Sequence, residues 1–249
     1  MVRREVIGRY RGSFLGLAWS FFYPILMLAV YTFVFSVVFK ARWGIGDDEG
    51  KTQFALVLFS GLIIYNLFAE TANRAPQLIL TNVNFVKRVV FPLEILPVVI
   101  IGAGLFQSFV SLLVLLAALF ALNGFLHWTI LFSPIVFLPI VVLTLGFTWM
   151  LASLGVFLRD VGQIIGIVTT IMLFVSPIFY PISALPERLQ PWLMLNPLTF
   201  IIEQARAVLI FGHAPNWIGL LLYSAIAMSI AWLGFAWFQK TRKGFADVL

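Results

Sequence analysis

The chain has 249 residues, of which 62% are hydrophobic and 10% are charged, and its mean hydropathy is +1.05. Because a soluble domain needs far more charged surface, this composition excludes a soluble globular protein and indicates a polytopic membrane protein. The net charge of +6 comes mostly from residues expected on the cytoplasmic side, so it indicates topology and lipid contact rather than nucleic-acid binding. With no cysteine, disulfides and thiolate metal sites are excluded.

Residues 2–18 are predicted to form a basic helix lying in the membrane interface. Their apolar positions recur at helical spacing, and the helix carries four arginines: Arg3, Arg4, Arg9 and Arg11. Residues 19–39 contain no charge and are long enough, at about 1.5 Å per residue, to cross a hydrocarbon core of about 30 Å. A surface helix therefore leads into the first span, and its arginines place the amino-terminus in the cytoplasm.

Four further spans are predicted from apolar runs. They cover residues 54 to about 72, part of 95–122, part of 130–157 and about 163–182. Glu70 lies four residues before Arg74. An acid and a base in this order attract one another on one face of a helix, which stabilises a helix emerging from lipid. The loop at 40–53 sums to no net charge and suits the outer face, whereas Arg159 and Asp160 turn inside.

Residues 76–92 are polar enough to leave the membrane between the second and third spans. They include Lys87 and Arg88 and are closed by Pro92. We expect a short cytoplasmic helix here, and the alternative is a solvated loop between two spans.

Residues 183–215 are ambiguous, because an apolar run there contains Glu203 and Arg206. Two buried charges would cost about 2.5–3.5 kcal/mol each on insertion scales, and a full span would turn the basic tail at 240–243 outward. We therefore expect a re-entrant pair of half-helices in the outer leaflet, with Glu203 and Arg206 as candidates for an outer gate. A last span at 217–238 completes six, with both termini inside.

The sequence contains no catalytic or nucleotide-binding pattern. It has no HExxH motif, no nucleophile elbow and no paired carboxylates within a span, so hydrolytic or metal catalysis has little support. It also lacks a GxxxxGK[ST] phosphate loop, so any ATP-driven work needs a partner. The spans lack embedded acids or bases of the kind that relay protons, which weakens a secondary-transporter interpretation.

The first span carries aromatic side chains at every fourth position, interrupted by one methionine. On a helix this spacing forms a slowly spiralling stripe: Trp19, Tyr23, Met27, Tyr31, Phe35 and Phe39. Stacked rings offer a sugar chain smooth contacts without fixed hydrogen bonds, whereas the alternative is helix packing and lipid contact.

Four segments together resemble one family, the type-2 ABC permeases that export polysaccharides. They are "GRYRGSFLGLAWSFFYPILMLAVYTFVFSVVF" from residue 8, "FVKRVVFPLEILP" at 85–97, "FLRDVGQIIGIVTTIMLFVSPIFYPI" at 157–182 and "NPLTFIIEQARAVL" at 196–209. The family includes O-antigen, teichoic acid and capsule transporters. The "FPLEILP" and "NPLT" elements make the resemblance closest to the O-antigen and teichoic acid permeases.

The resemblance implies an all-α integral membrane fold in which residues 1–249 form a single transmembrane domain. It also implies a homodimer on two copies of a separate ABC subunit, which binds ATP and Mg, so no cofactor is expected in this chain. The substrate would be a polysaccharide on undecaprenyl pyrophosphate. It would cross the bacterial inner membrane outward through a channel between the protomers, in contact with membrane lipids.

The resemblance and the residue patterns together suggest candidate site residues. Candidates for the lipid pyrophosphate at the interface are Arg9, Arg11, Leu15 and Gly16. Candidates for the glycan channel are Trp19, Tyr23, Tyr31 and Phe35. Candidates for coupling to the ATPase are Arg3, Arg4, Asn84, Lys87 and Arg88. The arginines would alternatively serve only as positive-inside anchors.

Two other classes of function stay open at this point. A membrane-embedded enzyme that modifies lipids or sugars would need a cluster of Asp, Glu or His at one membrane face. A passive channel would need a ring of charges or carbonyl groups. If the chain belongs to a polysaccharide exporter, teichoic acid or capsule is the alternative substrate to O-antigen.

Overall fold

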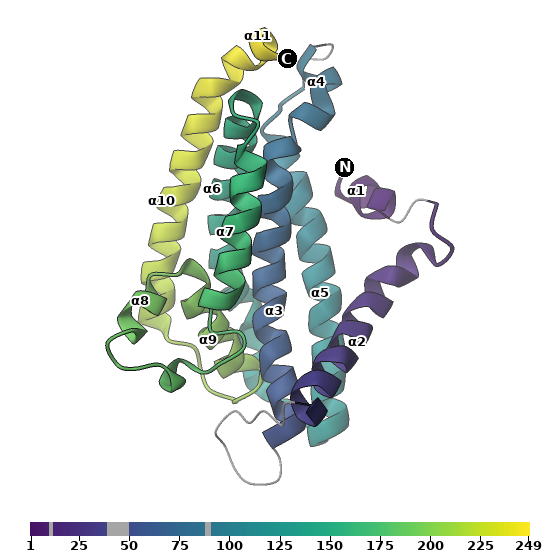
Figure 1. The fold of residues 1–249 in the computed structure, drawn as a ribbon, viewed down its shortest axis with the longest axis vertical. Coiled ribbons are helices and arrows are strands. Elements are labelled where there is room, and N and C mark those ends of the chain that lie inside the picture. Colours follow the sequence, from purple (N-terminus) through teal and green to yellow (C-terminus); the bar gives the residue numbers. More distant parts are fainter. Residues whose placement is uncertain (10–11, 39–49, 88–90) are drawn as a thin grey trace.

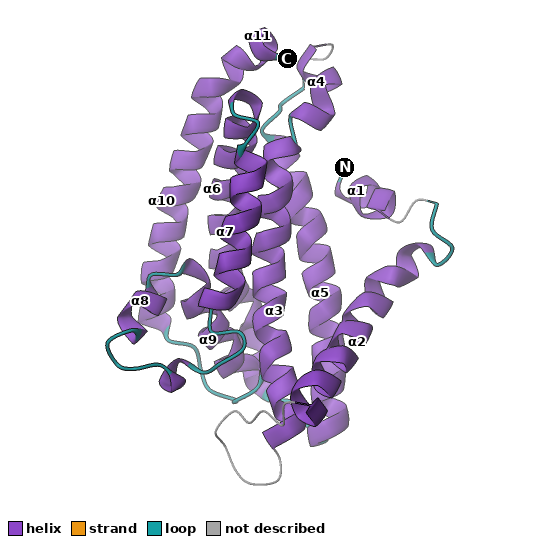
Figure 2. Ribbon diagram, viewed as in Figure 1, coloured by secondary structure: helices purple, strands orange, loops and turns teal. Residues whose placement is uncertain are grey.

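The computed structural model describes residues 1–9, 12–38, 50–87 and 91–249, and within these ranges every regular element is a helix (Figure 2). Five described helices are long and apolar enough to cross a membrane, and they lie within 16–35, 53–77, 95–123, 128–157 and 217–244. Most of them run along the long axis of the molecule, as Figure 1 shows. The chain is therefore an all-α integral membrane protein.

The amino-terminal helix is shorter than predicted. Helix α1 spans Val2–Arg9 rather than 2–18, and a 3-10 turn, η1 (Gly16–Ala18), precedes α2 (Trp19–Tyr31). Gly12 and Gly16 have φ angles of +89° and +50°, in the left-handed region that ends a right-handed helix. The interface helix and the first span are therefore separate elements that can take different directions.

The first span changes its helical register before it ends. Helix α2 continues as η2 (Thr32–Val38), which has π-helical hydrogen bonding. A π-helical segment has more residues per turn than an α-helix, so the slow rotation of a stripe spaced every four residues changes its sense at this point. The stripe predicted over the whole span is for this reason divided between two environments.

Helix α3 (Gly50–Arg74) is the central element of the fold. In its apolar window 83% of residues are buried, against 11% to 39% in the other four long helices. It packs against α5 (Ile95–Asn123), α6 (Ser133–Phe157) and α9 (Pro197–Leu209). The other helices therefore shield α3 from lipid.

Helix α6 packs closely along α10 (Trp217–Thr241). The closest approach lies at Gly146 and Gly234, where a Cβ atom on Gly234 would overlap the carbonyl oxygen of Gly146. Small residues of this kind let helix backbones meet within a membrane, where packing rather than the hydrophobic effect drives association. The turn before α6 is η5 (Trp128–Phe132).

Helix α7 (Val161–Val175) ends earlier than the predicted fifth span at 163–182. It has 15 residues and is about 22 Å long. After Ser176 the chain turns back through η6 (Ile182–Ala184) into α8 (Gln190–Met194) and α9. With 13 residues, α9 is too short for a full span. Helix α8 has only 5 residues, so of the two only α9 has the length of a half-helix, and the re-entrant arrangement stays a prediction.

The segment between α3 and α5 forms short helical pieces instead of one helix over 76–92. They are η3 (Ala75–Gln77), η4 (Leu80–Asn82) and α4 (Val83–Lys87). Gly155 of α6 lets the backbone of Pro76 lie directly against it, since a Cβ atom there would overlap the Pro76 carbonyl group. This packing holds the start of the segment against α6.

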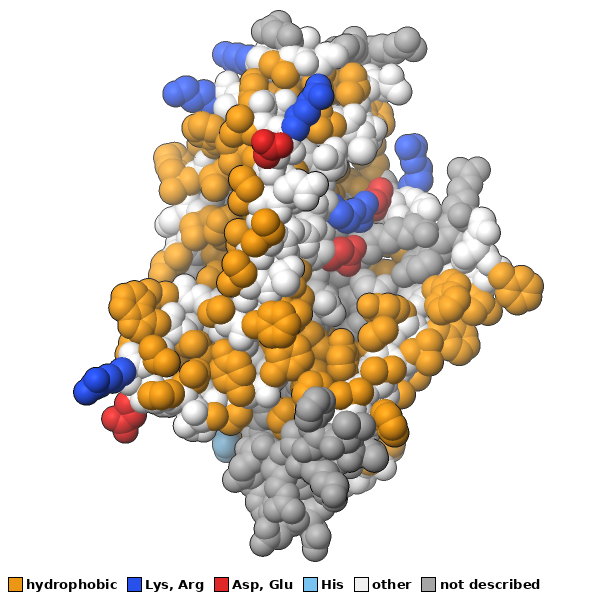
Figure 3. Space-filling view, in the orientation of Figure 1, with side chains coloured by type: hydrophobic (Ala, Val, Ile, Leu, Met, Phe, Trp, Pro, Cys, Tyr) orange, Lys and Arg blue, Asp and Glu red, His pale blue; other side chains and the backbone are white. Residues whose placement is uncertain are grey.

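The carboxyl-terminal elements lie at the same end of the molecule as α1 and α4 (Figure 1). They are η7 (Arg242–Gly244) and α11 (Phe245–Val248), and Phe245 packs in a small core with Phe238 and Ile79. Figure 3 shows hydrophobic side chains over the middle of the visible face and most charged side chains near this end. Such a distribution suits a protein embedded in a bilayer.

Candidate functional site

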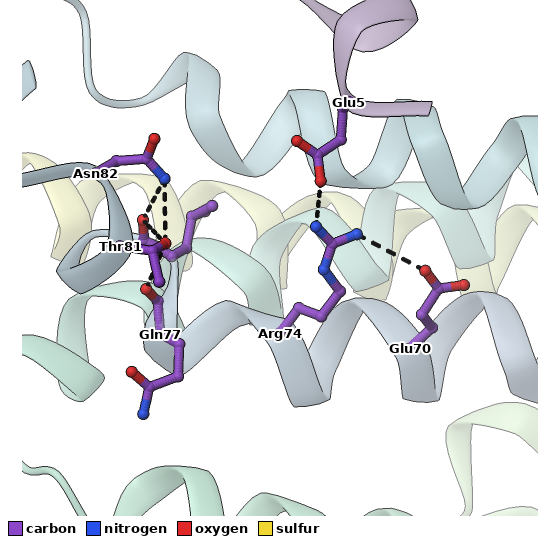
Figure 4. A network of polar contacts seen from close by, with 7 residues as sticks. Glu5, Glu70, Arg74, Gln77, Thr81 and Asn82 are labelled. Carbon is purple, nitrogen blue, oxygen red and sulfur yellow. Dashed lines mark hydrogen bonds and ion pairs between the residues drawn. The ribbon is translucent and has the colours of Figure 1, made fainter. Parts of the chain in front are cut away.

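Three charged residues join the amino-terminal helix to the central helix (Figure 4). Arg74, the last residue of α3, forms an ion pair with Glu5 of α1, and its Nη1 atom lies 3.8 Å from Oε1 of Glu70. The pair of Glu70 with Arg74 was predicted from spacing. Glu5 was not singled out, because no local pattern shows that a residue 69 positions away will meet Arg74.

Packing fixes the same helix against α5. A Cβ atom on Gly102 would lie 2.7 Å from Cγ2 of Val2, and Val6 is buried. The coupling candidates Arg3 and Arg4 are exposed, and Arg4 also lines a cavity between α1 and the bundle. The apolar side of the helix and Glu5 attach it to the bundle.

A cavity of about 530 Å³ opens between α1, the end of α3, the following short helices and α5. Its polar lining residues are Arg4, Glu5, Asn73, Arg74, Gln77, Thr81 and Asn82. Thr81 and Asn82 also donate hydrogen bonds to the carbonyl groups of Gln77 and Leu78, at 3.0 and 2.8 Å (Figure 4). These bonds satisfy backbone groups that short helical turns leave open.

The segment after α4 is fixed by Glu94. Its carboxylate accepts hydrogen bonds from Nη1 of Arg242 at 3.0 Å and from Gln239 at 3.4 Å. Its carbonyl oxygen accepts one from the indole of Trp149 at 3.1 Å. Glu94 is the acid of "FPLEILP", for which the sequence indicated no role. The motif thus connects the start of α5 to α6 and α10.

The remaining coupling candidates lie in the same region. Asn84 is exposed on α4, whereas the side chain of Lys87 and the whole of Arg88 lie outside the described residues. Their part in coupling stays a prediction.

The pyrophosphate candidates lie around the bend between α1 and α2. Leu15 is exposed, and the amide of Gly16 donates to the hydroxyl group of Ser13 at 3.0 Å. No atom lies within 4 Å of a Cβ atom built on Gly16, so its backbone is open to a ligand. Arg11 and the side chain of Arg9 lie outside the described residues, so this set stays a prediction.

A second cavity, of about 370 Å³, lies between α2, α3 and α5, and we call it the α2–α3–α5 cavity. Tyr23 and Tyr31 of the aromatic stripe line it, with Met27 between them. Phe35 instead stacks in the core against Phe179, with ring centroids 6.0 Å apart. Trp19 is 38% exposed and does not line the cavity, and Phe39 lies outside the described residues.

At the opposite end of the bundle, Arg206 of α9 is fully buried. Its Nη1 atom lies 2.7 Å from Oε1 of Glu203, and its other nitrogens donate to the carbonyl groups of Val57 and Ile178, at 3.3 and 3.2 Å. A guanidinium group suits this place because it presents several donors in one rigid plane. Arg206 thereby holds α9 against α3 and against the chain that follows α7.

Asn196 explains the "NPLT" motif. It caps α9, because its Oδ1 atom accepts from the amide of Leu198 at 3.0 Å and Pro197 occupies the first helical position. Its side-chain nitrogen donates to the hydroxyl group of Ser176 at 2.8 Å. The motif therefore both starts α9 and attaches it to the end of α7.

Comparison with known proteins gives matches along the chain. The family model described as ABC-2 type transporter matches residues 1–210. The O-antigen export system permease protein RfbA of Myxococcus xanthus is 28% identical over 249 residues, which covers 99% of this chain and 93% of that protein. RfbA of Klebsiella pneumoniae is 26% identical over 97 residues, or 39% of this chain and 34% of that protein.

Proposed function

Because the chain belongs to the ABC-2 type transporter family, we propose that it is the membrane subunit of an ATP-driven exporter of O-antigen-like polysaccharide. The name of the Myxococcus xanthus relative, which is similar over nearly the whole chain, supports this class of substrate. The substrate is carried on undecaprenyl pyrophosphate and leaves the cytoplasm across the bacterial inner membrane. Two copies of this chain act with two copies of a separate subunit that binds ATP and Mg.

One observation carries the proposal: a single surface at one end of the bundle joins the elements that would have to move together. The central helix α3 passes into η3 without a break, and Arg74 links its end to α1. Glu94 links the same surface to Gln239 of α10 and to Arg242, which follows that helix. A force applied to residues 76–92 by an ATP-binding subunit would therefore reach the central helix, the interface helix and the last span.

The opposite end provides an outer gate. Helices α8 and α9 lie there, and Arg206 attaches α9 to α3 and to the end of α7. The hydrogen bonds of Arg206 to the carbonyl groups of Val57 and Ile178 hold the closed position. Movement of α3 would change these contacts and open the outer end of the path.

The coupling surface can be tested in cells that depend on this chain for export. Reversing charge with Lys87→Glu and Arg88→Glu should abolish surface polysaccharide while the protein remains inserted, because the surface facing the ATP-binding subunit would change sign. The control reverses two other exposed cytoplasmic charges, Arg159→Glu and Lys240→Glu. Surface polysaccharide and lipid-linked glycan retained inside are measured by immunoblot.

The outcomes separate the two parts of the proposal. Normal export by the double variant Lys87→Glu, Arg88→Glu would mean that residues 76–92 are only a loop between two spans. If deleting the chain left surface polysaccharide unchanged and caused no glycan to accumulate inside, the proposed function itself would be wrong. Loss of teichoic acid or capsule in place of O-antigen would change only the substrate.

A further inference from the structure

The cavity of about 530 Å³ between α1 and the bundle, which we call the α1 cavity, contains polar groups that the contacts around Arg74 leave available. Arg4 lines it and makes no hydrogen bond or ion pair with any other described residue. Glu5 binds Arg74 through Oε1, which leaves its Oε2 atom able to accept. Asn82 donates through Nδ2 to the carbonyl group of Leu78, and its Oδ1 atom accepts no hydrogen bond within the described part of the chain. One guanidinium group and two acceptor oxygens therefore line one cavity.

These groups come from two sides of the α1 cavity. Arg4 and Glu5 belong to α1, whereas Asn82 belongs to the short helical pieces that follow α3. In Figure 4 the second oxygen of Glu5 points toward the side on which Asn82 lies. A ligand in the cavity would therefore contact both the interface helix and the bundle.

The apolar part of the lining lies at the start of a span. Helix α5 begins at Ile95 and contributes Leu96, Val99 and Ile100, all within about 8 Å of its first residue along the helix axis. The α1 cavity thus extends from polar groups to the first turns of a membrane helix. In a bilayer this level holds phospholipid headgroups and the adjoining ends of their acyl chains.

The headgroup of a zwitterionic aminophospholipid has the complementary chemistry. Its phosphate accepts two parallel hydrogen bonds from a guanidinium group such as that of Arg4. Its primary ammonium group has three N–H donors, which suit Oε2 of Glu5 and Oδ1 of Asn82. The glycerol and acyl carbons match the apolar residues of α5.

Other ligands fit less well. A phosphoglycerol headgroup would offer its phosphate to Arg4 but no cation to Glu5, and a choline headgroup has no N–H group to donate. A pyrophosphate would add further negative charge beside Glu5, whose carboxylate already shares Arg74 with Glu70. An apolar ligand would cover the free oxygens of Glu5 and Asn82 without giving them a donor.

We propose that the α1 cavity binds the headgroup of a zwitterionic aminophospholipid of the phosphatidylethanolamine type from the cytoplasmic leaflet, and that the bound lipid holds α1 against the bundle. Arg4 binds its phosphate, and Glu5 and Asn82 bind its ammonium group. The inference goes beyond the proposed function, from which it takes only the side of the membrane, and it does not depend on the exported substrate.

The test measures lipid binding to the purified full-length chain, alone and in complex with its ATP-binding subunit. Phosphatidylethanolamine, phosphatidylcholine and phosphatidylglycerol with the same acyl chains are each titrated, and bound lipid is counted by native mass spectrometry. We expect phosphatidylethanolamine to bind about tenfold more tightly than phosphatidylcholine, because only its ammonium group donates hydrogen bonds to a carboxylate. It should also bind more tightly than phosphatidylglycerol.

Two variants separate the two parts of the headgroup. Arg4→Gln should weaken the binding of both zwitterionic lipids about tenfold, because both contain the phosphate, and Arg4→Lys should restore part of the loss. Glu5→Gln should instead remove the preference for phosphatidylethanolamine over phosphatidylcholine. The matched control is Arg3→Gln, at an exposed neighbour on α1 that does not line the cavity, and it should leave both affinities unchanged.

A further measurement reports on the position of α1. Cysteines placed at Val2 and Gly102 are oxidised in vesicles of phosphatidylethanolamine or of phosphatidylcholine, each mixed with the same fraction of phosphatidylglycerol. The disulfide should form faster in the first vesicles. With Arg4→Gln the two rates should be equal.

Equal affinities of the unmodified chain for the three lipids would overturn the proposal. Equal losses with Arg3→Gln and Arg4→Gln would also overturn it, because lipid would then be attracted by the net charge of α1. Tighter binding of phosphatidylglycerol or of undecaprenyl pyrophosphate would make the cavity an anion site, and loss of the lipid in the complex would assign the cavity to the ATP-binding subunit. Each of these results would leave the proposed function intact, because export is measured separately in cells.

Discussion

Arg206 shows how a single side chain can fix a helix in this protein. Its guanidinium group is fully buried and contacts one carboxylate and two backbone carbonyl groups, from three separate parts of the chain. Gly61 of α3 leaves the space for it, since a Cβ atom there would lie 3.2 Å from Nη2 of Arg206. A smaller or apolar residue would leave these acceptors without their donor.

Replacing Arg206 by methionine should therefore destabilise the protein. Removing one partner of a buried ion pair costs about 3–5 kcal/mol. Because the side chain of Glu203 is 37% exposed, we expect the lower end of that range, about 3 kcal/mol. The measurement is the thermal midpoint of the purified protein. It is obtained from the fraction of protein that stays monodisperse after heating. Arg206→Lys should restore only part of the loss, because an ammonium group cannot reach three acceptors in one plane.

Arg188 provides the matched control for this measurement. It is exposed and lies in the loop before α8, so Arg188→Met should leave the midpoint unchanged. Equal midpoints for the wild-type protein and Arg206→Met would show that the buried contacts contribute nothing to stability.

At the scale of elements, a partly exposed ion pair and apolar packing together hold α1 against the bundle. The ion pair of Glu5 with Arg74 is about one-third exposed on both sides, and exposed pairs contribute about 0–1 kcal/mol. The contact of Val2 with Gly102 and the burial of Val6 add apolar packing. A helix held this way can be displaced at modest cost, which suits an element that responds to a partner subunit.

A disulfide should capture α1 in its docked position. The Cβ atom of Val2 lies 3.5 Å from the position of a Cβ atom on Gly102, which is within the range found in disulfides. We expect Val2→Cys with Gly102→Cys to cross-link under mild oxidation, and Glu5→Gln to slow the reaction severalfold by freeing the helix. Cross-linking is measured by the mobility shift after proteolysis between the two positions.

The control for this experiment pairs Val2→Cys with Gly124→Cys, at the other end of α5. This pair should not cross-link. Equal rates with and without Glu5→Gln would mean that packing alone positions α1.

At the scale of the whole molecule, the arrangement of the ends predicts topology. Helices α1, α4 and α11 lie at one end of the bundle, and α8 and α9 lie toward the other (Figure 1). We predict that α7 crosses the membrane in addition to the five long helices, which makes an even number of crossings. An even number returns the chain to the side on which it began.

A reporter fused after Leu249 should therefore signal the cytoplasm, and a reporter inserted after Glu187 should signal the outer side. The measurement compares a reporter active only in the cytoplasm with one active only outside it. An external signal after Leu249 would mean that α7 does not cross the membrane or that α8 and α9 together do.

Much of the fold could be predicted from the sequence, because hydropathy and helical periodicity are properties of neighbouring residues. The long apolar runs predicted six spans. Five of them are helices of spanning length, whereas the span predicted at 163–182 is the shorter helix α7. The pair of Glu70 with Arg74 followed from a spacing of four. The sequence contains Gly12 and Gly16, but it does not show that both adopt a positive φ angle and interrupt the helix predicted over residues 2–18. Boundaries depend on local conformation, which periodicity describes poorly.

The contacts between residues distant in the sequence were decided only by the tertiary structure. Arg206 meets the carbonyl group of Val57 across 149 positions, and Arg74 meets Glu5 across 69. The turn to π-helical bonding after Tyr31 directs Phe35 to the core while Tyr23 stays at a cavity. Composition and spacing determine which segments become helices in a membrane. Which faces of those helices meet depends on their crossing angles and on the close approach at a few glycines, because side-chain packing acts between segments that the sequence does not bring together.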